Sequence, residues 1–217
     1  MSEHLEIEQK FEVDPGFERP SFAGLAGVTA ADPVLHHLSA TYFDTADGSL
    51  AASKITLRRR TGGTDEGWHL KLPASAGARR EVHAPLGPAE REVPGELAAR
   101  VAEVTGGRPL APIATLHTER TVVTLHAGDG RAVAEVADDL VTARRLPADG
   151  GPSGSTGGPG GEGGEGGEGG TVLRWREIEV EVPVADPALQ RAAADLLLAA
   201  GARPAGHGSK LARLLDA

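Results

Sequence analysis

Charged and apolar residues alternate along several segments of the chain, and this pattern predicts β-strands. In the stretch HLEIEQKFEV (residues 4–13), Glu6, Glu8 and Lys10 alternate with Ile, Gln and Phe. In REIEVEV (176–182), three glutamates alternate with Ile and Val. Because alternate side chains of an extended strand share a face, each segment would have one charged face and one largely apolar face.

The wider hydrophobic pattern predicts an order of elements. Strands are expected over residues 5–13, 38–45, 53–60, 68–73, 79–86, 114–127, 131–141 and 171–184. Helices are expected over 94–106, 186–201 and 208–216, with a loop and a short helix over 14–36. The strands follow one another without a regular strand–helix alternation. This order favours an α+β fold, mainly antiparallel β, in which a sheet or barrel has peripheral helices.

Length and composition favour a single domain over residues 1–217. Residues 147–170 are mostly Gly and carry almost no apolar side chains, so we expect a flexible loop insertion within that domain. The chain has no cysteine, which excludes a disulfide framework and a thiolate metal site. No apolar run reaches the roughly 18 residues of a membrane span, and no secretory signal is recognisable, so a cytoplasmic location is expected. The net charge of -9 argues against broad nucleic-acid binding.

The charged strand faces are unusual because each is dominated by one sign. In SKITLRRR (53–60), Arg58 and Arg60 share a face with Thr56, opposite Ile and Leu. Water-facing strands usually mix polar residue types, so an ordinary wet sheet face explains one strand but not the set. If the apolar faces of a closed barrel point outward under the helices, the charged faces line its interior. Carboxylates there would suit a hard divalent cation, and Arg and Lys would suit a phosphate-rich anion.

The ordered motifs of the chain resemble those of the CYTH domain of the triphosphate tunnel metalloenzyme superfamily. The motifs are EIEQK (6–10), YFDT (42–45), LRRR (57–60), WHLKLP (68–73), RRE (79–81), TER (118–120), AEVADD (134–139), WREIEVEV (175–182) and SKLAR (209–213). The resemblance extends over nearly the whole chain and is closest to the bacterial CYTH type often fused to a CHAD domain. No CHAD domain is expected here, since the sequence stops after SKLARLLDA.

The resemblance implies an eight-stranded closed β-barrel, the triphosphate tunnel, and assigns its residues to roles. The implied catalytic carboxylates are Glu6, Glu8, Glu177, Glu179 and Glu181, with Mg²⁺ or Mn²⁺ on Glu6, Glu8, Glu179 and Glu181. The implied substrate-binding residues are Lys10, Arg58, Arg60, Lys71, Arg79, Arg120 and Lys210. Glu81, Glu135 and Asp139 are expected to support them from the tunnel wall.

The function that the resemblance implies is metal-dependent hydrolysis of a linear triphosphate, with inorganic triphosphate as the first choice. Aromatic residues are only 3% of the chain, which makes a nucleotide-binding pocket less expected. The alternatives are a polyphosphate-binding module with little catalysis, and thiamine triphosphatase or class IV adenylate cyclase activity. The histidines are scattered without metal-ligand spacing and are interpreted as surface or loop residues. Tyr42 and Phe43 are interpreted as packing residues, and Lys54 as a solvated side chain.

Overall fold

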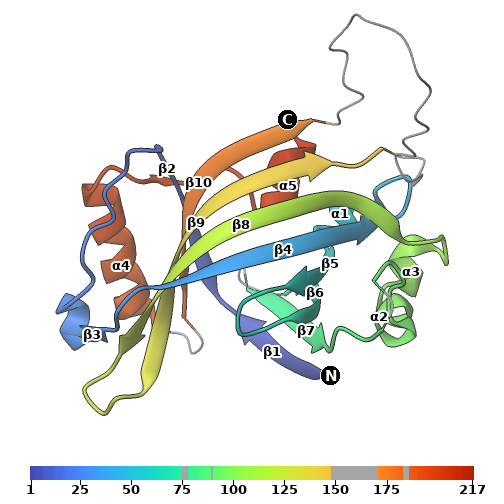
Figure 1. The fold of residues 1–217 in the computed structure, drawn as a ribbon. Helices are drawn as coiled ribbons and strands as arrows, with labels where there is room; N and C mark the ends of the chain where they lie inside the picture. Colours follow the sequence, from blue (N-terminus) through green and yellow to red (C-terminus); the bar gives the residue numbers. More distant parts are fainter. Residues whose placement is uncertain (75–77, 89, 148–170, 183–185) are drawn as a thin grey trace, which may run out of the picture.

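The computed structural model describes residues 1–74, 78–88, 90–147, 171–182 and 186–217. The predicted Gly-rich insertion therefore lies outside the described residues, except for Pro147. Long antiparallel strands pair side by side in one sheet that curls into a half-barrel, with helices at its sides and at one end (Figure 1).

The strands are β1 (Ser2–Glu6), β2 (Glu8–Val13), β3 (Thr29–Ala30), β4 (Val34–Asp44), β5 (Thr56–Thr61), β6 (Gly67–Pro73), β7 (Arg79–Ala84), β8 (Ala111–His126), β9 (Ala132–Arg145), β10 (Val172–Glu181) and β11 (Arg203–Pro204). The helices are η1 (Leu25–Gly27), α1 (Ser49–Ala52), α2 (Gly95–Arg100), α3 (Ala102–Thr105), α4 (Pro187–Ala199) and α5 (Lys210–Leu215). The predicted α+β class, mainly antiparallel β, is confirmed.

The sheet follows the order β1-β7-β6-β5-β4-β8-β9-β10-β2-β11, and β3 is added to β8. Apart from the short β11, the strand order begins with β1 and ends with β2. These two strands are consecutive in the chain and are separated by Ile7. The predicted single N-terminal strand is thus divided: its first half pairs with β7 and its second half with β10. Counted as one bent strand, it makes eight strands together with β4 to β10, which is the predicted number, in a sheet that is curled into a half-barrel. Ile7 links β1 to β2 through the chain itself.

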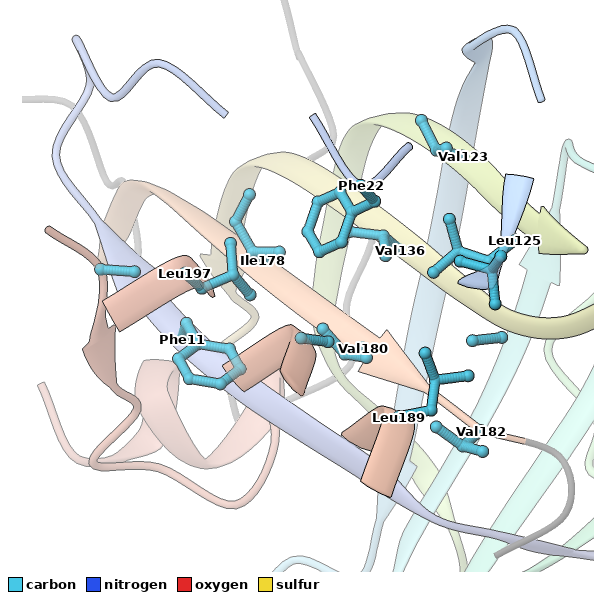
Figure 2. Close-up of a cluster of buried hydrophobic side chains, with 14 of the residues drawn as sticks. Phe11, Phe22, Val123, Leu125, Val136, Ile178, Val180, Val182, Leu189 and Leu197 are labelled. Atoms are coloured by element: carbon cyan, nitrogen blue, oxygen red, sulfur yellow. The ribbon is translucent and has the colours of Figure 1, made fainter. Parts of the chain in front are cut away.

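Two apolar clusters cover the outer face of the sheet, as strand parity predicts. Figure 2 shows the first, in which Phe11 and Ile178 pack beneath Leu197 of α4. In the second, Trp68 of β6 packs with Leu97 of α2. Burying these large side chains gives the sheet much of its stability, because each is worth about 1.5–3 kcal/mol of transfer free energy.

Helix α5 differs from the other helices because it packs against the inner face of the sheet. Its Leu211 and Leu214 lie in a third cluster with Trp175 of β10 and Val141 of β9. Trp175 has the same strand parity as the glutamates of β10, so the helix covers one end of the charged face. Ser209 caps the helix by accepting a hydrogen bond from the Ala212 amide at 3.0 Å.

Two predicted elements have other bounds in the structure, and one short helix lies outside the predicted elements. Strand β4 begins at Val34 rather than at 38, and the predicted helix over 94–106 is divided into α2 and α3 at Val101. Helix α1 follows a turn at residues 46–47, and the Asp44 carboxylate accepts hydrogen bonds from the amides of Leu50 at 2.8 Å and Ala51 at 2.9 Å. Those bonds satisfy donors that the first turn of a helix otherwise leaves without partners.

Candidate functional site

A cavity of about 380 Å³ lies on the inner face of the half-barrel. It receives side chains from both halves of the N-terminal strand, from β4 to β10 and from the start of α5. The predicted site residues that line it are Glu6, Glu8, Lys10, Arg58, Arg60, Lys71, Arg79, Glu81, Arg120, Glu135, Glu179, Glu181 and Lys210. Glu177 and Asp139, the remaining two, are buried behind Lys210.

The Lys210 ammonium is surrounded by three buried carboxylates. Its Nζ lies 2.8 Å from Asp139, 2.8 Å from Glu177 and 2.6 Å from Glu179. Arg120 closes the same network, since its guanidinium donates to both oxygens of Asp139 at 2.8 and 2.6 Å. Burial opposes ionisation of Asp139, but Lys210 and Arg120 hold the pKa of this carboxyl below its usual value.

The carboxylates of Asp139, Glu177 and Glu179 offer oxygens within 4.8 Å of one another, so by spacing this group could hold a metal ion. In the structure the Lys210 ammonium lies where such a cation would bind. Glu179 is also contacted by Lys10, and its other oxygen accepts from Arg120 at 2.6 Å. Against the cost of burial, these cations keep the pKa of Glu179 well below its ordinary value. A metal ion on Glu179 would have to displace them.

A second group of acidic side chains extends across three strands and contacts fewer cations than the first. Glu181 of β10 lies directly opposite Glu8 of β2 on one side and Glu135 of β9 on the other. Directly opposed side chains on one sheet face have Cβ atoms about 5 Å apart, and like charges at this spacing repel. Burial, then Glu6, Glu8 and Glu135, raise the pKa of Glu181 to about 7, although Lys71 opposes the shift. We call Glu8, Glu135 and Glu181 the acidic row.

Glu6 lies at the edge of the acidic row and is incompletely paired. One of its oxygens accepts a hydrogen bond from Lys71. The other, Oε2, is buried, and none of the described residues donates to it. Burial, with smaller contributions from Glu8 and Glu81, raises the pKa of the Glu6 carboxyl against the effect of Lys71. Carboxylate oxygens in this state are suited to a hard divalent cation.

The opposite wall of the cavity is cationic. Arg58 donates to the Tyr42 hydroxyl at 3.3 Å, and Arg60 contacts Asp65. The Nε atoms of Arg58 and Arg60 are buried, and within the described part of the chain nothing accepts a hydrogen bond from them. Burial, and then the charges of Arg58 and Arg120, lower the pKa of Arg60 to about 9. An anion between these guanidinium groups would satisfy their donors and offset their repulsion.

Arg79 reaches the cavity from β7 and donates to the backbone oxygen of Gly208 at 2.7 Å, just before α5. Its neighbour Arg80 is exposed and lies 3.4 Å from Glu3. Lys54 is exposed, as expected. Of these two neighbouring arginines, Arg79 is therefore the one that faces the cavity.

The interpretation of the histidines as surface or loop residues is wrong for His69, which is 3% exposed and lies in the cavity wall. His69 contacts Glu81 through Nδ1 at 2.7 Å and the Asp65 backbone oxygen through Nε2 at 3.0 Å. Strand parity contained the signal, since His69 alternates with Trp68 and Leu70 and shares a face with Lys71. Tyr42 packs in a buried cluster, as expected, and in addition lines the cavity.

The fold and the cavity define a class of protein in which a curled antiparallel sheet holds opposed acidic and basic walls. The chain matches the family model of the CYTH domain over residues 4–214. The chain therefore belongs to the CYTH domain family. Proteins of this family bind triphosphate-type substrates, depend on metal ions and are often triphosphatases or cyclases.

Two Mycobacterium tuberculosis proteins, from strains CDC 1551 and H37Rv, are 42% identical to the chain over 226 residues, and both are described as uncharacterized. The alignment includes 99% of this chain and 40% of each relative, so the chain spans about two fifths of their length.

Two solved structures share the fold. A Bacillus halodurans protein provisionally named an adenylate cyclase superposes with a TM-score of 0.61 at 17% identity, covering 98% of both chains. A Hippeastrum protein, provisionally named an adenylyl cyclase and described as having a dominant triphosphatase activity, gives a TM-score of 0.52 at 19% identity, covering 97% of this chain and 95% of its own. Among the described residues, no helix has the length and apolar character needed to cross a membrane.

Proposed function

We propose that the chain is a divalent-metal-dependent hydrolase of linear triphosphates, and that inorganic triphosphate is its preferred substrate, cleaved to diphosphate and phosphate. The observation that carries this proposal is the division of one cavity into two walls of opposite charge. Arg58 and Arg60 have donors without partners among the described residues, and across the cavity Glu6 has an acceptor in the same state. A phosphate chain with a bound metal ion would satisfy both walls.

The cationic residues would bind the phosphate oxygens along the cavity. They are Lys10, Arg58, Arg60, Lys71, Arg79, Arg120 and Lys210. Arg58 and Arg60 have the greatest capacity for new hydrogen bonds, since their Nε atoms lack partners within the described residues. The planar guanidinium fork matches phosphate oxygens and fixes their orientation. Holding the chain in line accounts for much of the expected rate, because positioning and electrostatic stabilisation dominate phosphoryl transfer.

The carboxylates that fit a metal ion best are Glu6, Glu8 and Glu181, which together have fewer cation contacts than Glu179. Glu179 was also expected to be a metal ligand. It fits a metal ion less well, because Glu179 and its neighbours Glu177 and Asp139 all contact Lys210. When bound, Mg²⁺ or Mn²⁺ would act as a Lewis acid that offsets charge on the phosphate oxygens.

The protein's own residues would complete the hydrolysis. A carboxylate of the acidic row would orient the water that attacks the terminal phosphorus and would accept its proton. The bond between that phosphorus and the bridging oxygen would break, so that diphosphate leaves with the bonding electrons. Arg58 and Arg60, on the opposite wall, would stabilise the departing charge.

A specific observation favours a second candidate, a polyphosphate-binding module with little catalysis. Lys71 contacts Glu6, and Lys10 lies 3.2 Å from Glu8, so the protein partly neutralises these acids itself. A binding module needs the cations and tolerates carboxylates that serve as their counter-ions. Adenylate cyclase and thiamine triphosphatase activities remain further alternatives, and the names of the two structural neighbours make ATP a required test substrate.

The experiment that tests the proposal compares Glu8→Gln with a matched control, Glu119→Gln, on the exposed outer face of β8. Glu8→Gln should lower phosphate release from inorganic triphosphate about 10³-fold, equivalent to about 4 kcal/mol of barrier. Glu119→Gln should leave the rate unchanged. Normal turnover and normal metal dependence of Glu8→Gln would contradict the assignment of the acidic row. Tight polyphosphate binding by a wild-type protein that releases no phosphate would establish the binding module.

A further inference from the structure

His69 occupies an unusual position for a histidine, in the cavity wall with both ring nitrogens engaged. It lies in the middle of β6, with Nδ1 2.7 Å from Glu81 Oε1 and Nε2 3.0 Å from the backbone oxygen of Asp65. The side chain is 3% exposed. The ring is therefore almost fully buried, and it meets solvent only where it lines the cavity.

Both partners of His69 are hydrogen-bond acceptors. The Asp65 partner is a carbonyl oxygen, and Glu81 is a carboxylate whose pKa is far below its ordinary value despite burial, because it contacts His69 and lies near Lys71 and Arg58. A neutral imidazole carries one N–H and can satisfy one acceptor, whereas an imidazolium donates to both. The geometry around the ring thus suits the protonated form.

The surrounding charges oppose that form. Burial, then Arg58 and Arg60, lower the pKa of His69 to about 4 against the favourable effect of Glu81. Arg58 lies directly opposite His69 in the pairing of β5 with β6. The titratable and charged groups facing the ring or its partner Glu81 are Arg58 and Arg60 of β5, Asp65 of the β5–β6 loop, Lys71 of β6, Glu81 and His83 of β7, and His4 of β1. We therefore expect His69 to be neutral at pH 7 without a ligand, so that one of its two contacts has no hydrogen.

We propose that binding of a phosphate chain in the cavity protonates His69, which then adds a positive charge to the cationic wall. The inference rests on the proposed function, in that it takes a polyphosphate anion as the ligand of Arg58 and Arg60. The negative ligand offsets the repulsion from these two residues, while Glu81 and the Asp65 carbonyl remain to accept both N–H bonds. The proton comes from solvent and adds to the ring nitrogen that lacked one, so no other bond changes. Because the bound form holds an extra proton, affinity increases as pH falls.

The test is long-range ¹H–¹⁵N spectroscopy of the imidazole rings, which distinguishes a neutral ring from an imidazolium. Spectra are recorded between pH 5 and 8 with chelator present, without and with saturating inorganic triphosphate. His69→Gln identifies the His69 signals, and His69→Asn serves if that variant does not fold. We expect a neutral His69 in the free protein at pH 6 and an imidazolium in the complex. His117, on the exposed outer face, is the internal control and should show no change.

Calorimetry on the same samples separates the two hypotheses. Triphosphate binding with His69 still neutral at pH 5 to 6 would overturn this inference and leave the proposed function standing. Absence of triphosphate binding with chelator would overturn this inference, and absence of triphosphate binding with Mg²⁺ as well would also overturn the proposed function. An imidazolium already present in the free protein at pH 7 would overturn the proposed coupling between phosphate binding and protonation of His69. If the inference is right, wild-type affinity should increase relative to His69→Gln by up to about tenfold per pH unit below the pKa of the complex, since the protonation of the ligand itself is common to both proteins.

Discussion

Replacing Glu181 by Gln should stabilise the metal-free protein, and by an amount that grows with pH. Glu181 lies between Glu8 and Glu135 in the acidic row, and its pKa is about 7 instead of the ordinary 4.5. Between these two values the folded protein binds more protons than the unfolded chain, so wild-type stability falls as pH rises. At about 1.4 kcal/mol per pH unit, the loss between pH 4.5 and 7 is at most about 3 kcal/mol.

The assay is urea unfolding at pH 4.5, 6, 7 and 8 with chelator present. Glu181→Gln retains the shape of the side chain but cannot ionise, so it lacks this loss. At pH 8 the variant should be more stable than the wild type by up to about 3 kcal/mol, and near pH 4.5 the two should agree. Glu119→Gln, an exposed glutamate of β8, should follow the wild type. A difference between Glu181→Gln and wild type that does not change with pH would refute the reasoning, as would a variant that is less stable at pH 8.

Two further substitutions test other parts of the structure. Lys210→Met should reduce the free energy of unfolding at pH 7 by about 3–5 kcal/mol, because it leaves three buried carboxylates short of a counter-ion. Lys54→Met, at an exposed site, is the control. A loss below about 1 kcal/mol for Lys210→Met would contradict the network. Gly62→Ala should destabilise by more than about 1 kcal/mol in thermal unfolding, since φ is +80° and an added Cβ would lie 2.1 Å from the His37 backbone oxygen. An unchanged melting temperature for Gly62→Ala would show that the β5–β6 loop does not have this conformation.

Strand parity made the arrangement of the site largely predictable. The alternation of Arg58 and Arg60 with Leu57 is enough to place the arginines on the inner face and the leucine beneath the helices. The same alternation applies to His69, which was misinterpreted because the histidines show no metal-ligand spacing. That criterion tests for a metal site and gives no information about which strand face a residue occupies.

The pairing of charges within the cavity could not be predicted from sequence. Lys10 contacts Glu179, which lies 169 residues further along the chain, and Lys210 reaches three carboxylates from helix α5, which is not part of the sheet. Such pairs depend on the register between strands and on where α5 packs. Local residue patterns determine neither the register between strands nor the packing position of α5. The division of the N-terminal strand at Ile7 has the same origin, because its two halves pair with different strands, β7 and β10.

The most direct test of the account is phosphate release by the wild-type protein from inorganic triphosphate, ATP and thiamine triphosphate, each with Mg²⁺, with Mn²⁺ and with chelator. We expect fast release from inorganic triphosphate, lost with chelator, and slower release from the two organic triphosphates. Absence of release from all three, or release that does not change when metal is removed, would contradict the central claim that the opposed charged walls form a metal-dependent triphosphatase site.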